Sequence, residues 1–249
     1  MRDSRVRLVA VALFAVVALG TRSALGQVTG AQIDESKVQV FLYVDQSNPA
    51  AGDSNAGTSG SPLKTISAAV TRASQTAGGT KISIGPGVYR ESISLAKFNL
   101  YNPSPLILQA SSSPGSVVVS GSLVWTGWAL QKNGTYTHSW PYSWGNAAIP
   151  EGWPTLATIV LRREMIFVNG QPLRQVLNQS SLLPGTFFVV DGKTITIYPP
   201  AGTQMSSAQV EVATRPALLS RPNGISNLVL RGLVFQHDNT AANGNGTGP

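Results

Sequence analysis

The 249-residue sequence predicts an all-β protein whose short strands stack on one another. Short apolar runs recur along the chain and are separated by glycine, proline, serine and asparagine. Charged residues make up only 12% of the chain, which contains 25 glycines and 16 prolines. Only one segment has apolar residues at helical spacing. Strands joined by tight turns therefore account for most of the sequence, and its length suits one large domain.

The N-terminus predicts a secretory signal peptide over residues 1–26. Arginines precede an apolar run over residues 8–19, and the small residues Ala24 and Gly26 suit cleavage before Gln27. The run is shorter than the roughly 20 residues that a membrane-spanning helix needs. We therefore expect a secreted, extracellular or periplasmic protein with no stable membrane span after cleavage. An uncleaved membrane anchor is the alternative.

Charge and cysteine content narrow the classes of partner and of site. Residues 1–26 contain four arginines and one aspartate, so their removal lowers the formal net charge from +7 to +4. The remaining basic residues form no cluster of the kind that tracks phosphates, so nucleic acid is not expected as a partner. The chain has no cysteine, which excludes disulfides and thiolate zinc sites.

One amphipathic helix is predicted after a weakly patterned linker over residues 27–40, a short strand over 40–44 and a turn-rich loop. Ser61 suits the N-cap and Pro62 the first helical position. Apolar residues then recur at helical spacing until Gly78. Because its apolar face needs a partner, we expect this helix to cap the end of a strand stack.

The strands that follow have the pattern of a parallel coil. Ile82 and Ile84 alternate with polar residues, a Gly-Pro-Gly turn follows, and Ile93 and Leu95 resume the alternation. Two more apolar runs occupy residues 106–108 and 117–119. Short apolar strands between tight corners are typical of a coil in which each turn buries its inward side chains against the next.

Residues 122–215 interrupt this rhythm and predict an inserted antiparallel β subdomain. All five tryptophans of the chain lie in this segment. Two hairpin signals follow, at Asn169-Gly170 and at Asp191-Gly192. Over residues 216–240 the apolar strand pattern resumes, with Gly232 at a corner, and residues 241–249 are expected to be a truncated tail.

Several segments resemble pectate-lyase-like right-handed parallel β-helix proteins. The opening of that family carries a similar strand, helix start and corner in this order: Phe41-Leu42-Tyr43-Val44-Asp45, Gly57-Thr58, Ser61-Pro62-Leu63-Lys64-Thr65-Ile66 and Gly85-Pro86-Gly87-Val88-Tyr89-Arg90-Glu91. A second set is similar to β-helix proteins that include β-xylosidase-type glycoside hydrolases: Arg163-Glu164-Met165-Ile166-Phe167-Val168-Asn169-Gly170, Gly185-Thr186-Phe187-Phe188 and Arg231-Gly232-Leu233-Val234-Phe235-Gln236-His237. Together the two sets cover most of residues 41–240.

The resemblance implies a right-handed parallel β-helix with an N-terminal capping α-helix and the inserted antiparallel β subdomain. Residues 41–121 then form the cap and first coils, and residues 216–240 a resumed coil. The expected function is that of a secreted protein acting on polysaccharide or oligosaccharide, as the N-terminal part of a glycoside hydrolase or polysaccharide lyase. The alternative is a non-catalytic surface, adhesion or carbohydrate-binding β-helix protein. In such enzymes the catalytic residues generally come from later coils, so the resemblance assigns none here.

Two pairs of residues are candidates for saccharide binding. His237 and Asp238 follow a strand, where a coil opens onto the groove in which such scaffolds place their sites. By simple alternation, however, His237 points inward with Leu233 and Phe235. Arg90-Glu91 lies at a predicted corner, where neighbouring opposite charges can also pair locally or stay solvated.

Calcium is the candidate cofactor. Asp45, Asp53 and Asn55 supply oxygen ligands of the type that calcium prefers, although Asp and Asn also favour loops because they bond their own backbone. The tryptophans likewise have two interpretations. Aromatic faces stack on sugar rings, and a small β subdomain needs large side chains for its core; we expect most tryptophans in the core and one or two on sugar.

Overall fold

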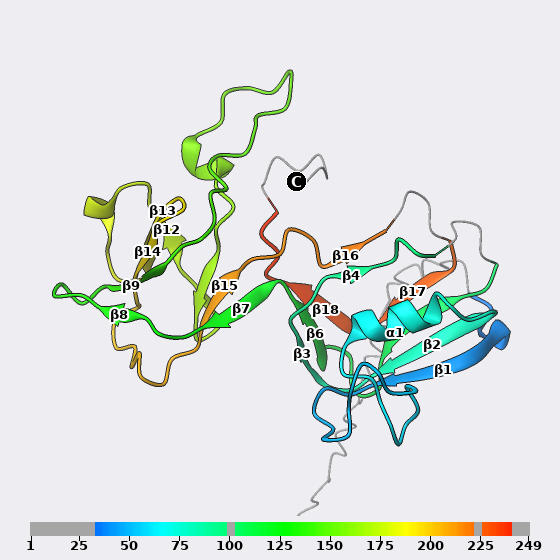
Figure 1. Ribbon diagram of the computed structural model, residues 1–249. Helices are drawn as coiled ribbons and strands as arrows, with labels where there is room; N and C mark the ends of the chain where they lie inside the picture. The colour runs from blue at the N-terminus through cyan, green and yellow to red at the C-terminus, as the bar shows by residue number, and fades with distance from the viewer. Residues whose placement is uncertain (1–32, 99–102, 222–225, 241–249) are drawn as a thin grey trace, which may run out of the picture. The chain divides into compact units, whose positions relative to one another are not determined.

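The computed structural model describes residues 33–98, 103–221 and 226–240 (Figure 1). The predicted signal peptide over residues 1–26, the first part of the linker and the tail over 241–249 lie outside the described residues. Within these residues the protein is mostly β, with a single α-helix, three short 3-10 helices and several open sheets. None of the helices in the described ranges is long and apolar enough to cross a membrane.

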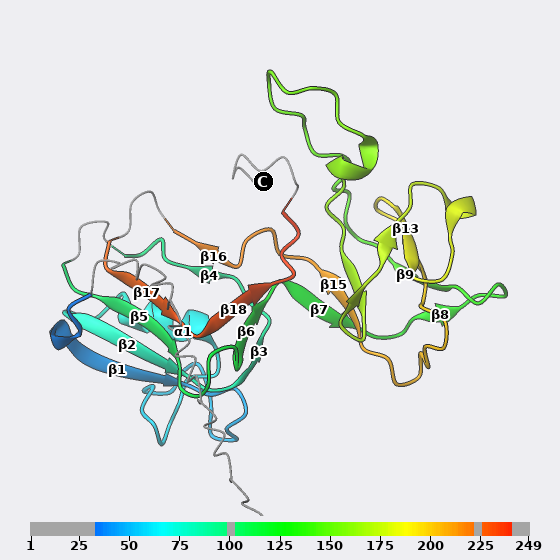
Figure 2. The ribbon, with the colours of Figure 1, turned by 180° about the vertical axis from the view of Figure 1, so that it is seen from behind.

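Strands of the first part of the chain pair in parallel with the last strands in three sheets (Figures 1 and 2). The first sheet contains β1 (Val38–Val44), β2 (Gly79–Ile84), β5 (Leu106–Ala110) and β17 (Leu228–Arg231). The second contains β3 (Gly87–Tyr89), β6 (Val117–Ser120) and β18 (Leu233–Gln236), and the third β4 (Ile93–Ser94) and β16 (Leu219–Ser220). From β2 onward the chain visits the three sheets in a repeating order, and the antiparallel strands interrupt this order between β6 and β16.

Alternation along these strands buries one side in an apolar core. Ile82 and Ile84 are fully buried, whereas Ser83 between them is partly exposed. The register aligns Leu42, Ile82 and Leu108 in neighbouring strands, so side chains of the same kind stack across the sheet. Leu230 continues this row in the edge strand β17 and is 41% exposed.

The helix α1 (Ile66–Ala73) begins four residues later than the Ser61-Pro62 signal predicts, and Thr65 is its N-cap. The backbone of Leu63 donates to Tyr43 O and accepts from Asp45 N, at 2.9 and 3.0 Å. This pairing with β1 holds the segment extended until Thr65, whose side chain accepts a hydrogen bond from Ala68 N. The buried side of α1 packs on the core of the parallel strands, against β1, β2 and β4.

The helix also ends earlier than predicted, at Ala73 rather than near Gly78. Ser74 is the C-cap. Its backbone N–H donates the last helical hydrogen bond to Val70 O at 3.0 Å, and turns follow. Gly78 has φ +86, a left-handed conformation that glycine adopts readily and that separates these turns from β2.

The antiparallel strands form two further sheets. One contains β7 (Ser122–Trp125), β10 (Ile166–Val168), β11 (Gln171–Pro172) and β15 (Val210–Ala213). The other contains β8 (Ala129–Leu130), β9 (Tyr136–Ser139), β12 (Arg174–Gln175), β13 (Thr186–Val190) and β14 (Thr194–Tyr198). The 3-10 helices span Glu35–Lys37, Thr158–Leu161 and Gln179–Ser181. Pairing is antiparallel throughout except between β12 and β13.

Both predicted hairpins are confirmed. Asn169 and Gly170 connect β10 to β11 with φ of 50 and 77°, the left-handed conformations that a tight hairpin turn requires. Gly192, with φ 65°, turns the chain between β13 and β14. A second apolar core lies between these strands, with Trp140, Ile166 and Phe187 among its most buried residues.

Candidate functional site

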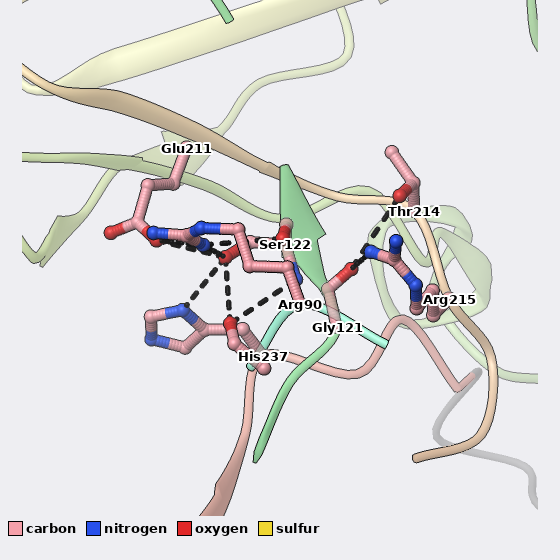
Figure 3. A network of polar contacts seen from close by, with 8 residues as sticks. Arg90, Gly121, Ser122, Glu211, Thr214, Arg215 and His237 are labelled. Atoms are coloured by element: carbon pink, nitrogen blue, oxygen red, sulfur yellow. Dashed lines mark hydrogen bonds and ion pairs between the residues drawn. The ribbon is translucent and has the colours of Figure 1, made fainter. Parts of the chain in front are cut away.

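One corner of the parallel strands gathers polar side chains from three successive passes of the chain. Tyr89, Val119 and Phe235 are aligned in β3, β6 and β18. The residues that follow these strands therefore leave the sheet at the same corner. Arg90, Ser122 and His237 lie there with Glu211 from β15, and these four residues are called the corner cluster (Figure 3).

The corner cluster is organised around the hydroxyl of Ser122, a fully buried residue. Arg90 Nη1 donates to Ser122 Oγ at 2.7 Å and to Glu211 Oε1 at 2.6 Å. Ser122 Oγ lies 2.9 Å from the same carboxylate oxygen. Arg90 directly follows the parallel strand β3, and Glu211 lies in the antiparallel strand β15, so their ion pair connects the two sets of strands.

His237 completes the cluster from the other side. Its backbone has φ 61°, which ends the alternation of β18 at this residue, so the side chain does not continue the inward row of Leu233 and Phe235. Its ring stacks on Phe167, with centroids 3.7 Å apart and an interplanar angle of 18°. Nδ1 lies 3.4 Å from Ser122 Oγ. Burial lowers the pKa of His237, and Arg90 lowers it further, whereas Glu211 opposes this change.

The backbone at this corner is packed closely. A Cβ on Gly121 would lie 2.3 Å from the carbonyl oxygen of His237, so only glycine fits at this position. The carbonyl of Gly121 accepts a hydrogen bond from Thr214 N at 2.9 Å. Longer contacts of 3.5 Å come from the Thr214 hydroxyl and from Arg215 Nη1 (Figure 3). The corner is thus held by the backbone as well as by the ion pair.

The corner cluster is a buried ion pair with additional hydrogen bonds, and its geometry fits no catalytic arrangement. In an acyl-transfer triad the carboxylate bonds the histidine and the serine is accessible, whereas here Glu211 bonds Ser122 and Arg90. Glycoside hydrolysis needs two carboxylates about 5–9.5 Å apart on either side of the scissile bond. The cluster contains one carboxylate, which is paired. We therefore assign it the positioning of strands and no catalytic step.

The other saccharide-binding candidates have different surroundings. Both carboxylate oxygens of Glu91 accept hydrogen bonds at the start of α1, from Ile66 N at 2.9 Å and from Ser67 N at 2.8 Å. A carboxylate there satisfies free N–H groups and complements the helix dipole. Asp238 is partly buried, and its Cα lies against Gly121. Arg90 and His237 thus meet in one cluster, while Glu91 contacts the helix.

The three calcium candidates each engage in separate hydrogen bonds. Asp45 Oδ1 accepts from Ser47, Asp53 accepts from the backbone of Lys64 and Thr65, and the Asn55 amide donates to Pro62 O. Within the described ranges, no group of three or more His, Cys, Asp or Glu residues is placed to hold a metal ion. The calcium site stays a prediction.

A cluster of rings occupies the antiparallel strands and contains four of the five tryptophans. The ring cluster consists of Trp125, Trp128, His138, Trp140, Tyr142 and Trp144. Trp140 is 1% exposed and belongs to the core, and the other five rings are half-buried around it. Trp153 is 53% exposed and lies outside this cluster.

Sequence reasoning missed Ser122 and Glu211. Glu211 lies 121 positions from its partner Arg90, so no local pattern connects them. The available signal was a single carboxylate within the apolar strand Val210–Ala213. Because a strand carboxylate next to valines has to find a cation or water, it marks a position where another part of the chain supplies a partner.

Comparison with known proteins identifies similar folds and no similar sequence. No protein-family model matches the chain, and no curated protein sequence matches it. Two solved structures match over 81% of the chain: XylC in complex with xylose, at 18% identity and a TM-score of 0.59, and a glycoside hydrolase, at 14% identity and a TM-score of 0.53. The chain spans 36% and 51% of the lengths of these two proteins. At these identities the similarity shows a shared fold.

Proposed function

We propose that this chain is the N-terminal part of a secreted, carbohydrate-active protein of the glycoside hydrolase class, built on a right-handed parallel β-helix. The observation that carries the proposal is the structural similarity over 81% of the chain to a xylose-bound protein and to a glycoside hydrolase. The repeated order in which the chain visits three parallel sheets supports the β-helix. The signal-peptide pattern supports export.

The proposed substrate is a neutral saccharide that contains xylose. XylC is the neighbour with a bound sugar, and that sugar is xylose. The two solved structures that match are, by name, a xylose-bound protein and a glycoside hydrolase. The hydrolase interpretation is therefore preferred to a lyase acting on acidic polymers.

Catalysis is proposed for the whole protein and is assigned to no residue of this chain. Three carboxylates already have hydrogen-bond or ion-pair partners within the protein. Glu91 accepts at the start of α1, Glu164 pairs with Arg162, and Glu211 pairs with Arg90. The contribution proposed for the described residues is scaffold and saccharide binding.

Titration calorimetry of the 249-residue chain with xylo-oligosaccharides tests this proposal. We expect saturable binding of xylohexaose and none of oligogalacturonate, with the same result in calcium and in EDTA if Asp45, Asp53 and Asn55 take no part. If the chain binds oligogalacturonate but not xylohexaose, and only in the presence of calcium, the proposed activity is that of a lyase and not of a hydrolase. Absence of binding to both would remove the carbohydrate function from this chain.

A further inference from the structure

We propose that Asn133 is the acceptor of an N-linked glycan, which is attached while the chain is exported by a cell that makes lipid-linked oligosaccharides. This inference rests on the export that forms part of the proposed function. Three observations carry it: the residues that follow Asn133 in the sequence, the exposed turn in which Asn133 lies, and the hydrogen bonds of its side chain.

The sequence at Asn133 has the acceptor pattern for N-linked glycans. Asn133, Gly134 and Thr135 form Asn-x-Thr with a residue other than proline in the middle. So short a pattern also arises by chance, and it marks an acceptor where it lies in a surface loop of an exported protein. Asn178-Gln179-Ser180 has the same pattern, and a third match, Asn245-Gly246-Thr247, lies outside the described residues.

Asn133 lies in an exposed turn. It belongs to the connection between β8 and β9, which pair as an antiparallel hairpin. Hydrogen bonds from Gln131 N to Thr135 O at 2.8 Å and from Gly134 N to Gln131 O at 3.0 Å close this turn. Asn133 and Gly134 are exposed, and apart from its chain neighbours no described atom lies within 4 Å of the Cβ position of Gly134. The turn therefore leaves room for a bulky, solvated group.

Thr135 arranges the side chain of Asn133. The Thr135 hydroxyl donates to Asn133 Oδ1 at 2.7 Å, and Thr135 N donates to the same oxygen at 3.3 Å. The nitrogen Nδ2, to which the sugar is attached, donates to none of the described residues. Bonds between residues two positions apart need no other part of the fold, so this arrangement is available to the chain before it folds.

Burial of Thr135 determines when the glycan is attached. Thr135 is only 2% exposed in the folded protein, whereas Asn133 is exposed. A transferase that recognises both residues therefore has to act before the hairpin packs. Because Asn133 is exposed in the folded protein as well, a glycan on its side chain is compatible with the fold.

The transfer is a substitution at the first carbon of the sugar. Asn133 Nδ2 forms a bond to that carbon, while the bond from the carbon to the diphosphate oxygen of the lipid carrier breaks. The lipid diphosphate leaves, the nitrogen loses one proton, and nothing is oxidised or reduced. The amide is uncharged before and after the reaction, so the glycan changes no ion pair of the protein.

Asn178 provides the internal comparison. It is exposed and precedes the 3-10 helix Gln179–Ser181, but its side chain makes no capping hydrogen bond. It thus shares the sequence pattern with Asn133 without the local arrangement that Thr135 gives. Asn178→Gln and Asn133→Gln make the same chemical change at two exposed positions, so the first variant is a matched control for the second.

Mass spectrometry of the secreted protein tests the site. The 249-residue chain is expressed in a eukaryotic secreting host, and the product is analysed before and after treatment with a peptide N-glycosidase. We expect the wild type to lose the mass of a glycan on treatment and to contain aspartate at position 133 afterwards. Asn133→Gln should lack this glycan, whereas Asn178→Gln and Thr135→Ser, which keeps a hydroxyl, should retain it.

The outcomes separate this inference from the proposed export. If the wild type is secreted with Asn133 unmodified, the inference fails while export stands. If Asn133→Gln carries as much glycan as the wild type, the acceptor lies elsewhere and the inference also fails. If the chain is not secreted, the proposed export fails. Residues 1–26 are then replaced by a signal peptide of the host, and the presence or absence of a glycan on Asn133 in that product decides the inference.

Discussion

At the scale of single residues, the corner cluster depends on one carboxylate. Glu211 is the counter-charge of Arg90, and the two side chains are 10% and 21% exposed. A buried ion pair adds little net stability, because each charge loses its water. Removing one partner is costly, since the other charge then stays buried without compensation.

Glu211→Gln should therefore lower the free energy of unfolding by about 3 kcal/mol, measured by urea denaturation with tryptophan fluorescence. Glu35→Gln is the control: Glu35 bridges Lys81 and Arg231 but its side chain is 38% exposed, so its loss should cost clearly less than the loss of Glu211. Equal losses in the two variants would show that burial of the Arg90 pair has no energetic consequence.

His237 gives this corner a dependence on pH. Burial lowers its pKa from 6.5, with Arg90 as a further cause and Glu211 as the opposing charge. The unfolded chain then binds a proton at a higher pH than the folded chain. The stability that neutral His237 contributes is fully present above pH 6.5. This contribution is lost as the pH falls through the lower pKa of the folded state.

His237→Asn tests this dependence, because asparagine tolerates the positive φ at this position. Compared with the wild type, the variant should show a flatter fall of unfolding free energy as the pH decreases below 6.5. The measurement is urea denaturation at a series of pH values. Parallel curves for the two proteins would rule out His237 as the titrating group.

At the scale of elements, the start of α1 shows how a tertiary contact overrides a local signal. Ser61-Pro62 is a good helix start by itself, but the backbone of Leu63 pairs with Tyr43 and Asp45 of the neighbouring segment. Thr65 becomes the N-cap, and Glu91, distant in the sequence, satisfies two free N–H groups.

Thr65→Ala and Ser61→Ala form a matched pair for this element. The first removes the bond to Ala68 N at 3.1 Å and a contact with Asp53, and should lower the free energy of unfolding by about 1 kcal/mol. The second should change it by no more than a few tenths. A larger loss in Ser61→Ala would place the N-cap where the sequence pattern alone predicts it.

At the scale of the whole molecule, strands that are far apart in the sequence pair in parallel in each of the three parallel sheets. Tyr89, Val119 and Phe235 are aligned across 146 positions only because each pass of the chain returns to the same sheets. The antiparallel strands leave this order after β6 and rejoin it before β16. The corner cluster lies where the chain departs, which explains why residues of both parts meet there.

Export is a property of the whole chain, and we propose it from the N-terminal pattern. Expressed in a secreting host, the protein should appear outside the cytoplasm with Gln27 as its first residue. Mass spectrometry of the mature N-terminus checks this. A product that keeps residues 1–26 and stays with the membrane would support the uncleaved anchor instead.

The sequence by itself determined the local features of this protein: the strands, the two hairpins and the presence of one helix. Alternation and turn residues act over a few positions, so Ile82, Ile84, Asn169-Gly170 and Asp191-Gly192 could be interpreted without a structure. The tertiary structure decided which of the candidate residues meet. Arg90 finds Glu211 through strand pairings that span most of the chain, and such pairings depend on backbone register rather than on any motif.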